Sequence, residues 1–139
     1  MKLLIIRHGD PDYVNDALTE KGRVEAACLA ERLAKMEIQA FYVSPLGRAK
    51  ETASYTLKKM NRKEEECLWL REFAAKIIRP DRGRESIIWD WLPADWTAEE
   101  KYYSRYNWAE TEVLQEGRVK QEYDWVTQSF DQLLASYGY

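Results

Sequence analysis

Near the amino terminus of this 139-residue chain stands the heptapeptide Leu3-Leu4-Ile5-Ile6-Arg7-His8-Gly9. Four branched aliphatic residues are too few to span a membrane, but they suit a strand that is buried on both faces of a parallel sheet. An α/β protein places its ligand crevice at the carboxyl ends of such strands, where Arg7, His8 and Gly9 lie here. The heptapeptide therefore predicts a buried strand at residues 3–6 with a binding site directly after it.

The bulk composition narrows the range of partners. The chain has 21 basic and 24 acidic residues and a single histidine, with a net charge of -3. This charge balance argues against a broad basic surface that binds nucleic acid, but it leaves room for a local basic pocket that binds small anions.

The length predicts one domain over residues 1–139. No signal peptide, membrane span or lipidation motif is visible, so the cytoplasm is the expected compartment, with Cys28 and Cys67 as buried free thiols.

Strands and helices alternate through the first half of the chain. Thr19 is the predicted N-cap of a helix whose packed face carries Gly22, Ala26, Leu29, Leu33 and Met36. A strand is expected at residues 40–43, and another at residues 67–70. Between them Ser44-Pro45 predicts a helix start, with a buried stripe of Leu46, Ala49, Ala53, Leu57 and Met60. This alternation is the pattern of a parallel α/β sheet.

The start of the second helix is a candidate anion site. Arg48 lies in its first turn, on a different face from the apolar stripe. Free backbone N–H groups, the helix dipole and a guanidinium all favour an anion there. The start of this helix is therefore expected to bind an anion with the help of Arg48.

The second half of the chain is rich in aromatic residues. Residues 79–96 combine a basic turn with several tryptophans that follow no period, and packing of these tryptophans against each other is the favoured explanation for them over ligand recognition. Thr97 resembles the start of a capping box. The last helix carries an apolar stripe of Val119, Tyr123, Val126, Phe130, Leu133 and Tyr137.

Four segments, in this order, resemble the histidine phosphatase superfamily, the phosphoglycerate mutase-like proteins. They are residues 4–9 (LIIRHG), 18–22 (LTEKG), 44–53 (SPLGRAKETA) and 70–72 (LRE). The resemblance covers about residues 1–73. It implies a three-layer α/β/α fold with a mainly parallel sheet, and a helical, aromatic-rich cap inserted at about residues 77–108.

The resemblance also implies a role for each matching residue. His8 corresponds to the nucleophile that becomes phosphohistidine, and Glu72 to the proton donor that protonates the leaving group. Arg7 and Arg48 correspond to the cationic phosphate cage, which stabilises charge spread over the equatorial oxygens. Asn15 matches a phosphate-contacting asparagine. No metal and no other cofactor is implied.

Members of this family complete the phosphate cage with a second histidine on a late strand, and His8 is the only histidine here. The expectation is therefore that the 139 residues are an amino-terminal fragment, which by itself lacks part of the catalytic site. The other interpretation is a naturally short, inactive relative.

The leading functional hypothesis is a phosphatase of small phosphorylated metabolites that works through phosphohistidine on His8. A mutase-type phosphotransferase is the nearest enzymatic alternative, and a non-catalytic phospho-ligand binder is the alternative from another class. The expected partner is a phosphorylated small molecule, with no nucleic acid and no membrane. Substrate identity and oligomeric state are left open by the sequence.

Overall fold

The computed structural model describes residues 2–139, which separate into two compact units on either side of the Arg71–Glu72 junction. Both units contain helices and short strands, so the predicted α/β class is confirmed in its general form. The first unit consists of β1 (Pro11–Asp12), β2 (Ala17–Leu18), α1 (Glu20–Leu33), β3 (Tyr42–Val43), α2 (Gly47–Met60), β4 (Glu65–Glu66) and the 3-10 helix η1 (Leu68–Leu70). None of the helices in residues 2–139 has the length and apolar character needed to cross a bilayer.

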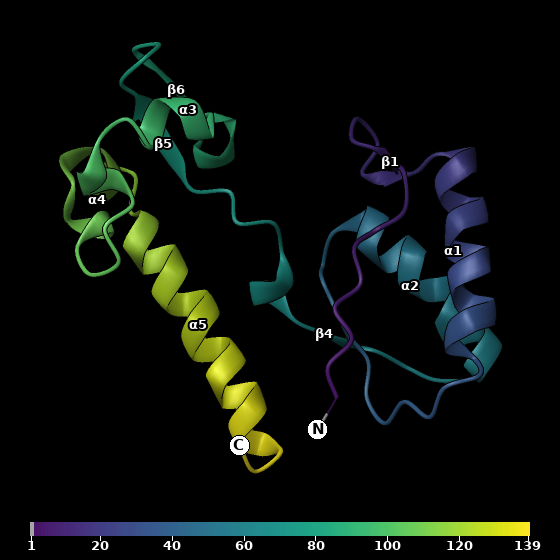
Figure 1. Ribbon diagram of the computed structural model, residues 1–139. Coiled ribbons are helices and arrows are strands. Elements are labelled where there is room, and N and C mark those ends of the chain that lie inside the picture. The colour runs from purple at the N-terminus through teal and green to yellow at the C-terminus, as the bar shows by residue number, and fades with distance from the viewer. Residues whose placement is uncertain (1) are drawn as a thin grey trace. The chain divides into compact units, whose positions relative to one another are not determined.

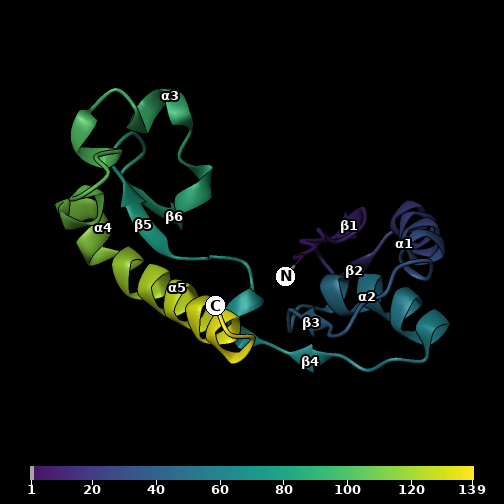
Figure 2. The same ribbon diagram turned by 60° about the horizontal axis from the view of Figure 1, so that its bottom comes forward.

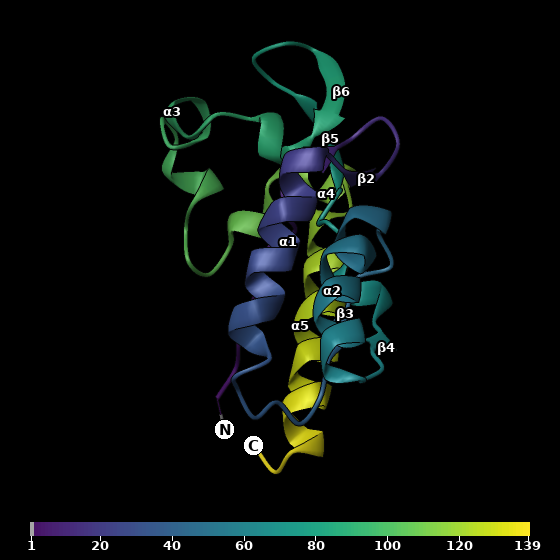
Figure 3. The ribbon, with the colours of Figure 1, turned by 90° about the vertical axis from the view of Figure 1, so that its right-hand side faces the viewer.

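Helices α1 and α2 pack against each other and form the body of the first unit (Figure 1; Figure 3). Helix α1 begins where the sequence predicts, because the Thr19 hydroxyl accepts a hydrogen bond from the Gly22 amide at 3.1 Å. Its buried residues are Gly22, Ala26, Ala30 and Leu33. Small residues on this face let the chain approach the helix closely.

Helix α2 differs from the prediction at its start and on its buried face. It begins at Gly47, with Leu46 in the N-cap position. Ser44 is therefore not the N-cap, and its hydroxyl accepts a hydrogen bond from the Leu46 amide at 3.3 Å. Its buried residues are Arg48, Thr52, Thr56 and Leu57, so most of the predicted apolar stripe is only half-buried. Of these polar residues, Thr52 lies against the chain at Gly9, whose amide donates to the Thr52 hydroxyl at 3.1 Å.

The predicted buried strand at residues 3–6 is wrong. This segment forms no strand, and its side chains are exposed, Ile5 to 90%. A strand requires a hydrogen-bonded neighbour, and none of the described strands pairs with this segment. The strand expected at residues 67–70 is also wrong, since η1 occupies Leu68–Leu70.

The sheets are smaller than the predicted one. Residues 2–139 form three two-stranded sheets, of which only β3–β4 is parallel, with Tyr42 opposite Glu65. Figure 2 labels both strands of this pair. The other two, β1–β2 and β5–β6, are antiparallel. A mainly parallel sheet in a three-layer arrangement is therefore not observed in the described part of the chain.

The second unit is built on the hairpin of β5 (Lys76–Arg79) and β6 (Arg84–Ile87). It continues through η2 (Ile88–Asp90), α3 (Pro93–Trp96), η3 (Glu100–Tyr102), η4 (Trp108–Glu110), α4 (Glu112–Glu116) and α5 (Val119–Ser136). Its core consists of Ala75, Ile77, Trp91, Leu114 and Val119, with further aromatic side chains packed around them. The tryptophan-rich stretch thus contributes to packing, as the structural interpretation predicts.

Three local predictions fail in detail. Thr97 opens no helix; it is the C-cap of α3, where its hydroxyl donates to the Pro93 carbonyl at 2.5 Å. Within the last helix only Val119 of the predicted stripe is buried. Cys67 is buried as expected, but Cys28 is exposed because it lies outside the face of α1 that packs.

Replacing Ile77 with alanine should destabilise the second unit by about 2–4 kcal/mol, because the side chain is only 2% exposed and its removal leaves a cavity in the core. The matched control is Ile78→Ala, at the next position of β5, where the side chain is 58% exposed and little should change. Urea unfolding followed by tryptophan fluorescence measures both. Equal effects of the two substitutions would contradict this account of the core.

Candidate functional site

The candidate site lies in the first unit, where residues 8–19 form a loop against α2. The loop is closed by the β1–β2 pairing, with Pro11 opposite Leu18, and by the Thr19 amide, which donates to the Asp10 carbonyl at 3.0 Å. The Thr19 hydroxyl also donates to the Asp10 carboxylate at 2.7 Å. The N-cap of α1 therefore also holds the start of the loop that follows His8.

The His8 ring is half-buried, and its Nδ1 lies 2.8 Å from the Gly9 carbonyl oxygen. A carbonyl oxygen can only accept, so this hydrogen bond requires the proton on Nδ1. The lone pair of the neutral ring is then on Nε2. This is the tautomer that a nucleophile attacking through Nε2 needs.

Tyr13 joins the imidazole to the guanidinium of α2. Its ring meets the His8 ring edge-on with centroids 6.3 Å apart, and the Arg48 Cζ lies 5.2 Å from its centroid. The cation over the aromatic face adds an attraction that favours this position of Arg48. Sequence reasoning missed Tyr13; an aromatic side chain inside the loop after His8 was the available signal.

Asp16 occupies the place where the sequence predicts an anion. Its carboxylate accepts hydrogen bonds from the Gly47 amide at 2.6 Å and from Arg48 Nη1 at 2.7 Å, with the Arg48 amide at 3.5 Å. The Gly47 amide above all, and then the Arg48 guanidinium, lower the pKa of the Asp16 carboxyl. The anion-binding character of the α2 amino end is thus observed, with a carboxylate of the same chain as the anion.

Close backbone contact makes this geometry dependent on two glycines. A Cβ on Gly47 would lie 2.2 Å from the Asp16 carbonyl oxygen, and one on Gly22 would lie 2.3 Å from the Asp10 carbonyl oxygen. Neither position has room for a side chain unless the loop moves. The two ends of the loop therefore lie directly on the two helices.

The other predicted site residues are exposed. Arg7 precedes His8 in the segment without strand structure. Asn15 lies in the loop, where its side-chain amide donates to the Asp12 carboxylate at 2.7 Å. Glu72 is the first residue of the second unit. Within the first unit the structure brings together His8, Tyr13, Asp16 and Arg48.

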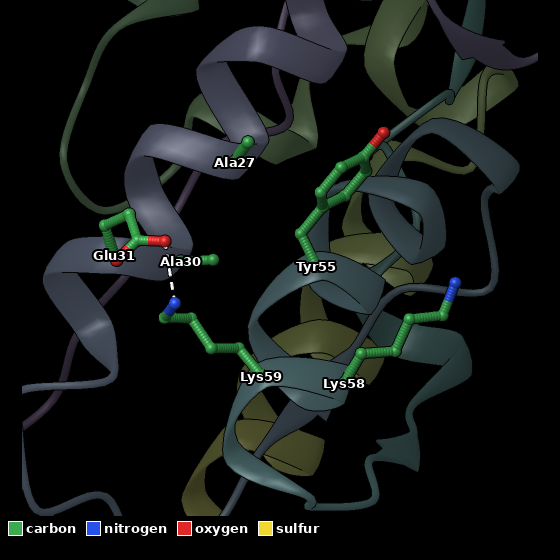
Figure 4. Close-up of a pocket in the computed structure, with 6 residues that line it drawn as sticks. All are labelled: Ala27, Ala30, Glu31, Tyr55, Lys58 and Lys59. Carbon is green, nitrogen blue, oxygen red and sulfur yellow. Dashed lines mark hydrogen bonds and ion pairs between the residues drawn. The ribbon is translucent and has the colours of Figure 1, made fainter.

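A shallow depression of about 390 Å³ lies between α1 and α2, apart from these residues. Figure 4 shows Ala27, Ala30 and Glu31 of α1 on one side and Tyr55 and Lys59 of α2 on the other, with Lys59 and Glu31 paired at 2.7 Å. Lys58 of α2 also lines the depression, and its side chain extends away from α1. None of these residues belongs to the predicted site. The depression is an open, solvated surface between two helices.

A comparison with protein families supports the sequence motifs. The family model of the histidine phosphatase superfamily (branch 1) matches residues 3–132, which is most of the chain. The protein therefore belongs to this superfamily. A search of curated proteins and a search of solved structures found no match.

A second carboxylate holds the end of the loop from the side of α2. Glu51 accepts hydrogen bonds from the Leu18 amide and from Arg23 Nε, both at 2.7 Å. These two hydrogen bonds lower the pKa of the Glu51 carboxyl, the one from the Leu18 amide more than the one from Arg23. Glu51 thus bridges α1, α2 and the loop.

The lowered pKa of Glu51 predicts a pH dependence for the first unit. Its contribution to stability should be complete above the unfolded pKa, about 4.3, and be lost as the pH falls through the lower folded pKa. Glu51→Gln should therefore flatten the loss of stability at acid pH, while Arg23→Gln should remove only part of it. Hydrogen exchange of the α1 and α2 amides between about pH 3 and 6 measures this. An unchanged pH slope in Glu51→Gln would contradict the role given to this carboxylate.

Proposed function

We propose that this protein is a phosphatase of small phosphorylated metabolites that forms a phosphohistidine on His8. Superfamily membership supports phosphatase or mutase chemistry in general. The observation that carries the specific proposal is the 2.8 Å contact between His8 Nδ1 and the Gly9 carbonyl oxygen, from which we infer that the lone pair of the neutral ring is on Nε2. Arg48 and the amino end of α2, linked to His8 through Tyr13, are the cationic groups of the same site.

The proposed reaction has two transfers. In the first, the Nε2 lone pair attacks phosphorus, the bond to the leaving oxygen breaks, and that oxygen takes a proton. Glu72 is the proposed donor of this proton, by its resemblance to the family's acid. In the second, water attacks the phosphohistidine, the P–N bond breaks and inorganic phosphate leaves, with the water proton returning to the same carboxylate.

Electrostatic stabilisation is the proposed role of the guanidiniums. The transferring phosphoryl group spreads charge over its equatorial oxygens, so fixed donors lower the barrier. Arg48 is suited to this role because its side chain is nine-tenths buried and held on one side by Tyr13. Arg7 and Asn15 are proposed to complete the cage on its exposed side.

The proposal also includes the layer arrangement, the cap and the cellular compartment that are expected for this protein. The three-layer arrangement and a cap at about residues 77–108 remain predictions from the resemblance. The cytoplasm is the proposed compartment, supported by the two free thiols, of which Cys28 is exposed. The substrate is a phosphorylated small molecule.

A non-catalytic phospho-ligand binder is the second candidate, because His8 is the only histidine in the sequence and the family's second histidine has no counterpart in it. The two candidates differ in one measurable step. A phosphatase transfers the phosphoryl group to His8, whereas a binder holds the intact ligand.

Replacing His8 with alanine should lower p-nitrophenyl phosphate hydrolysis by at least about 1,000-fold and abolish the acid-labile phosphoenzyme, because the nucleophile is gone. Arg48→Ala should lower the rate by about 100-fold or more, because a charged donor to the phosphoryl oxygens is lost. Arg32→Ala, on the exposed side of α1, is the matched control for loss of one arginine. Hydrolysis that survives His8→Ala would exclude the phosphohistidine route, and ligand binding without a phosphoenzyme in the wild type would favour the binder.

A further inference from the structure

We propose that Asp16 is an internal competitor of the phosphoryl ligand, and that phosphate reaches the anion site of α2 only by displacing the Asp16 carboxylate. The anion site of α2 is defined here by the Gly47 amide, the Arg48 amide and Arg48 Nη1. The inference rests on the proposed function, because it concerns the phosphate site assigned there. It adds a regulatory contact that controls access to that site.

The donors of the site are all directed at one carboxylate. One Asp16 oxygen lies 2.6 Å from the Gly47 nitrogen, and the other lies 2.7 Å from Arg48 Nη1. A backbone amide has a single hydrogen, so the Gly47 donor cannot bond strongly to Asp16 and to a phosphate oxygen at once. Residues 47–49 supply no acidic cap of their own, and the N-cap position has no side-chain hydrogen bond. The carboxylate is therefore the acceptor that a phosphate must replace.

Charge adds to this competition. A phosphate placed at hydrogen-bond distance from Arg48 Nη1 would lie next to the Asp16 carboxylate, and like charges at such short range repel. The Asp10 and Asp12 carboxylates are held elsewhere, by Thr19 and by Asn15 respectively. Asp16 is thus the loop carboxylate that shares its donors with the ligand.

The loop gives Asp16 a route out of the site. Its side chain is 42% exposed, so the carboxylate can move into water without crossing the protein interior. Its backbone has a positive φ of 47°, a left-handed conformation that aspartate tolerates and glycine prefers. Tyr13 and Val14, earlier in the same loop, are exposed as well.

The test is a titration of the 139-residue protein with inorganic phosphate at constant ionic strength, followed by the NMR shifts of the Gly47 and Arg48 amides. Asp16→Asn keeps the size of the side chain and removes its charge, so phosphate should bind about tenfold or more tightly than to the wild type. Glu31→Gln is the matched control, since it removes one charge of the same sign from the first unit, on the exposed side of α1, where the carboxylate pairs with Lys59. Its phosphate affinity should stay within about twofold of the wild type.

A second variant guards against a local folding defect. Asp16→Gly removes the carboxylate and suits the left-handed backbone, so it should also bind phosphate more tightly. Circular dichroism and amide exchange of α1 and α2 establish that each variant is folded. If folded Asp16→Asn and Asp16→Gly bind phosphate equally or more weakly than the wild type, the inference is overturned and Asp16 acts to position Arg48. No phosphate binding by any form at millimolar concentrations would overturn it as well.

This readout separates the inference from the proposed function because it requires no turnover. Tighter phosphate binding by the Asp16 variants, without a His8 phosphoenzyme in any of them, would support the competitor and reject the phosphatase. Unchanged phosphate binding in a protein that does form phosphohistidine would reject the competitor and leave the phosphatase supported.

Discussion

Two carboxylates hold the loop after His8 on α2, and the arrangement of the site depends on this contact. The Asp16 carboxylate, in the loop, accepts a hydrogen bond from the Gly47 amide at the amino end of α2. The Glu51 carboxylate, in α2, accepts a hydrogen bond from the Leu18 amide at the end of the loop. In the first bond α2 donates to the loop, and in the second the loop donates to α2, so the loop is held on α2 at Asp16 and at Leu18. Tyr13 lies in the loop between His8 and Asp16, and its ring meets the His8 imidazole and the Arg48 guanidinium.

The buried face of α2 is polar, and this has a physical reason. Buried polar groups are stabilised by hydrogen bonds, and the Thr52 hydroxyl accepts one from the Gly9 amide while it donates another to the Arg48 carbonyl. The same side chain thus connects the residue after His8 to the turn of α2 that carries Arg48. A face of this kind positions functional groups more narrowly than an apolar stripe does, because hydrogen bonds are directional.

The position of His8 does not depend on a strand in the described chain. The apolar residues before it are exposed, and the parallel pairing of β3 with β4 extends over two residues of each strand. The imidazole is placed instead by its own bond to the Gly9 carbonyl and by the contact of Gly9 with Thr52. The chemistry of the site therefore rests on the contact between loop and helix.

The amino-acid sequence by itself determined the features that depend on near neighbours. The start of α1 at Thr19, the existence of α2, the α/β class and the superfamily could all be read from it, because capping, periodicity and motifs act within a few residues. Only the tertiary structure decided that residues 3–6 have no strand partner, that Tyr13 lies between His8 and Arg48, and that Asp16 binds the amino end of α2. These features join residues that are far apart in the chain, 31 positions for Asp16 and Gly47 and 43 for Gly9 and Thr52. Local propensity carries no information on which distant donor a carboxylate or hydroxyl will meet, because that is set by how the whole unit packs.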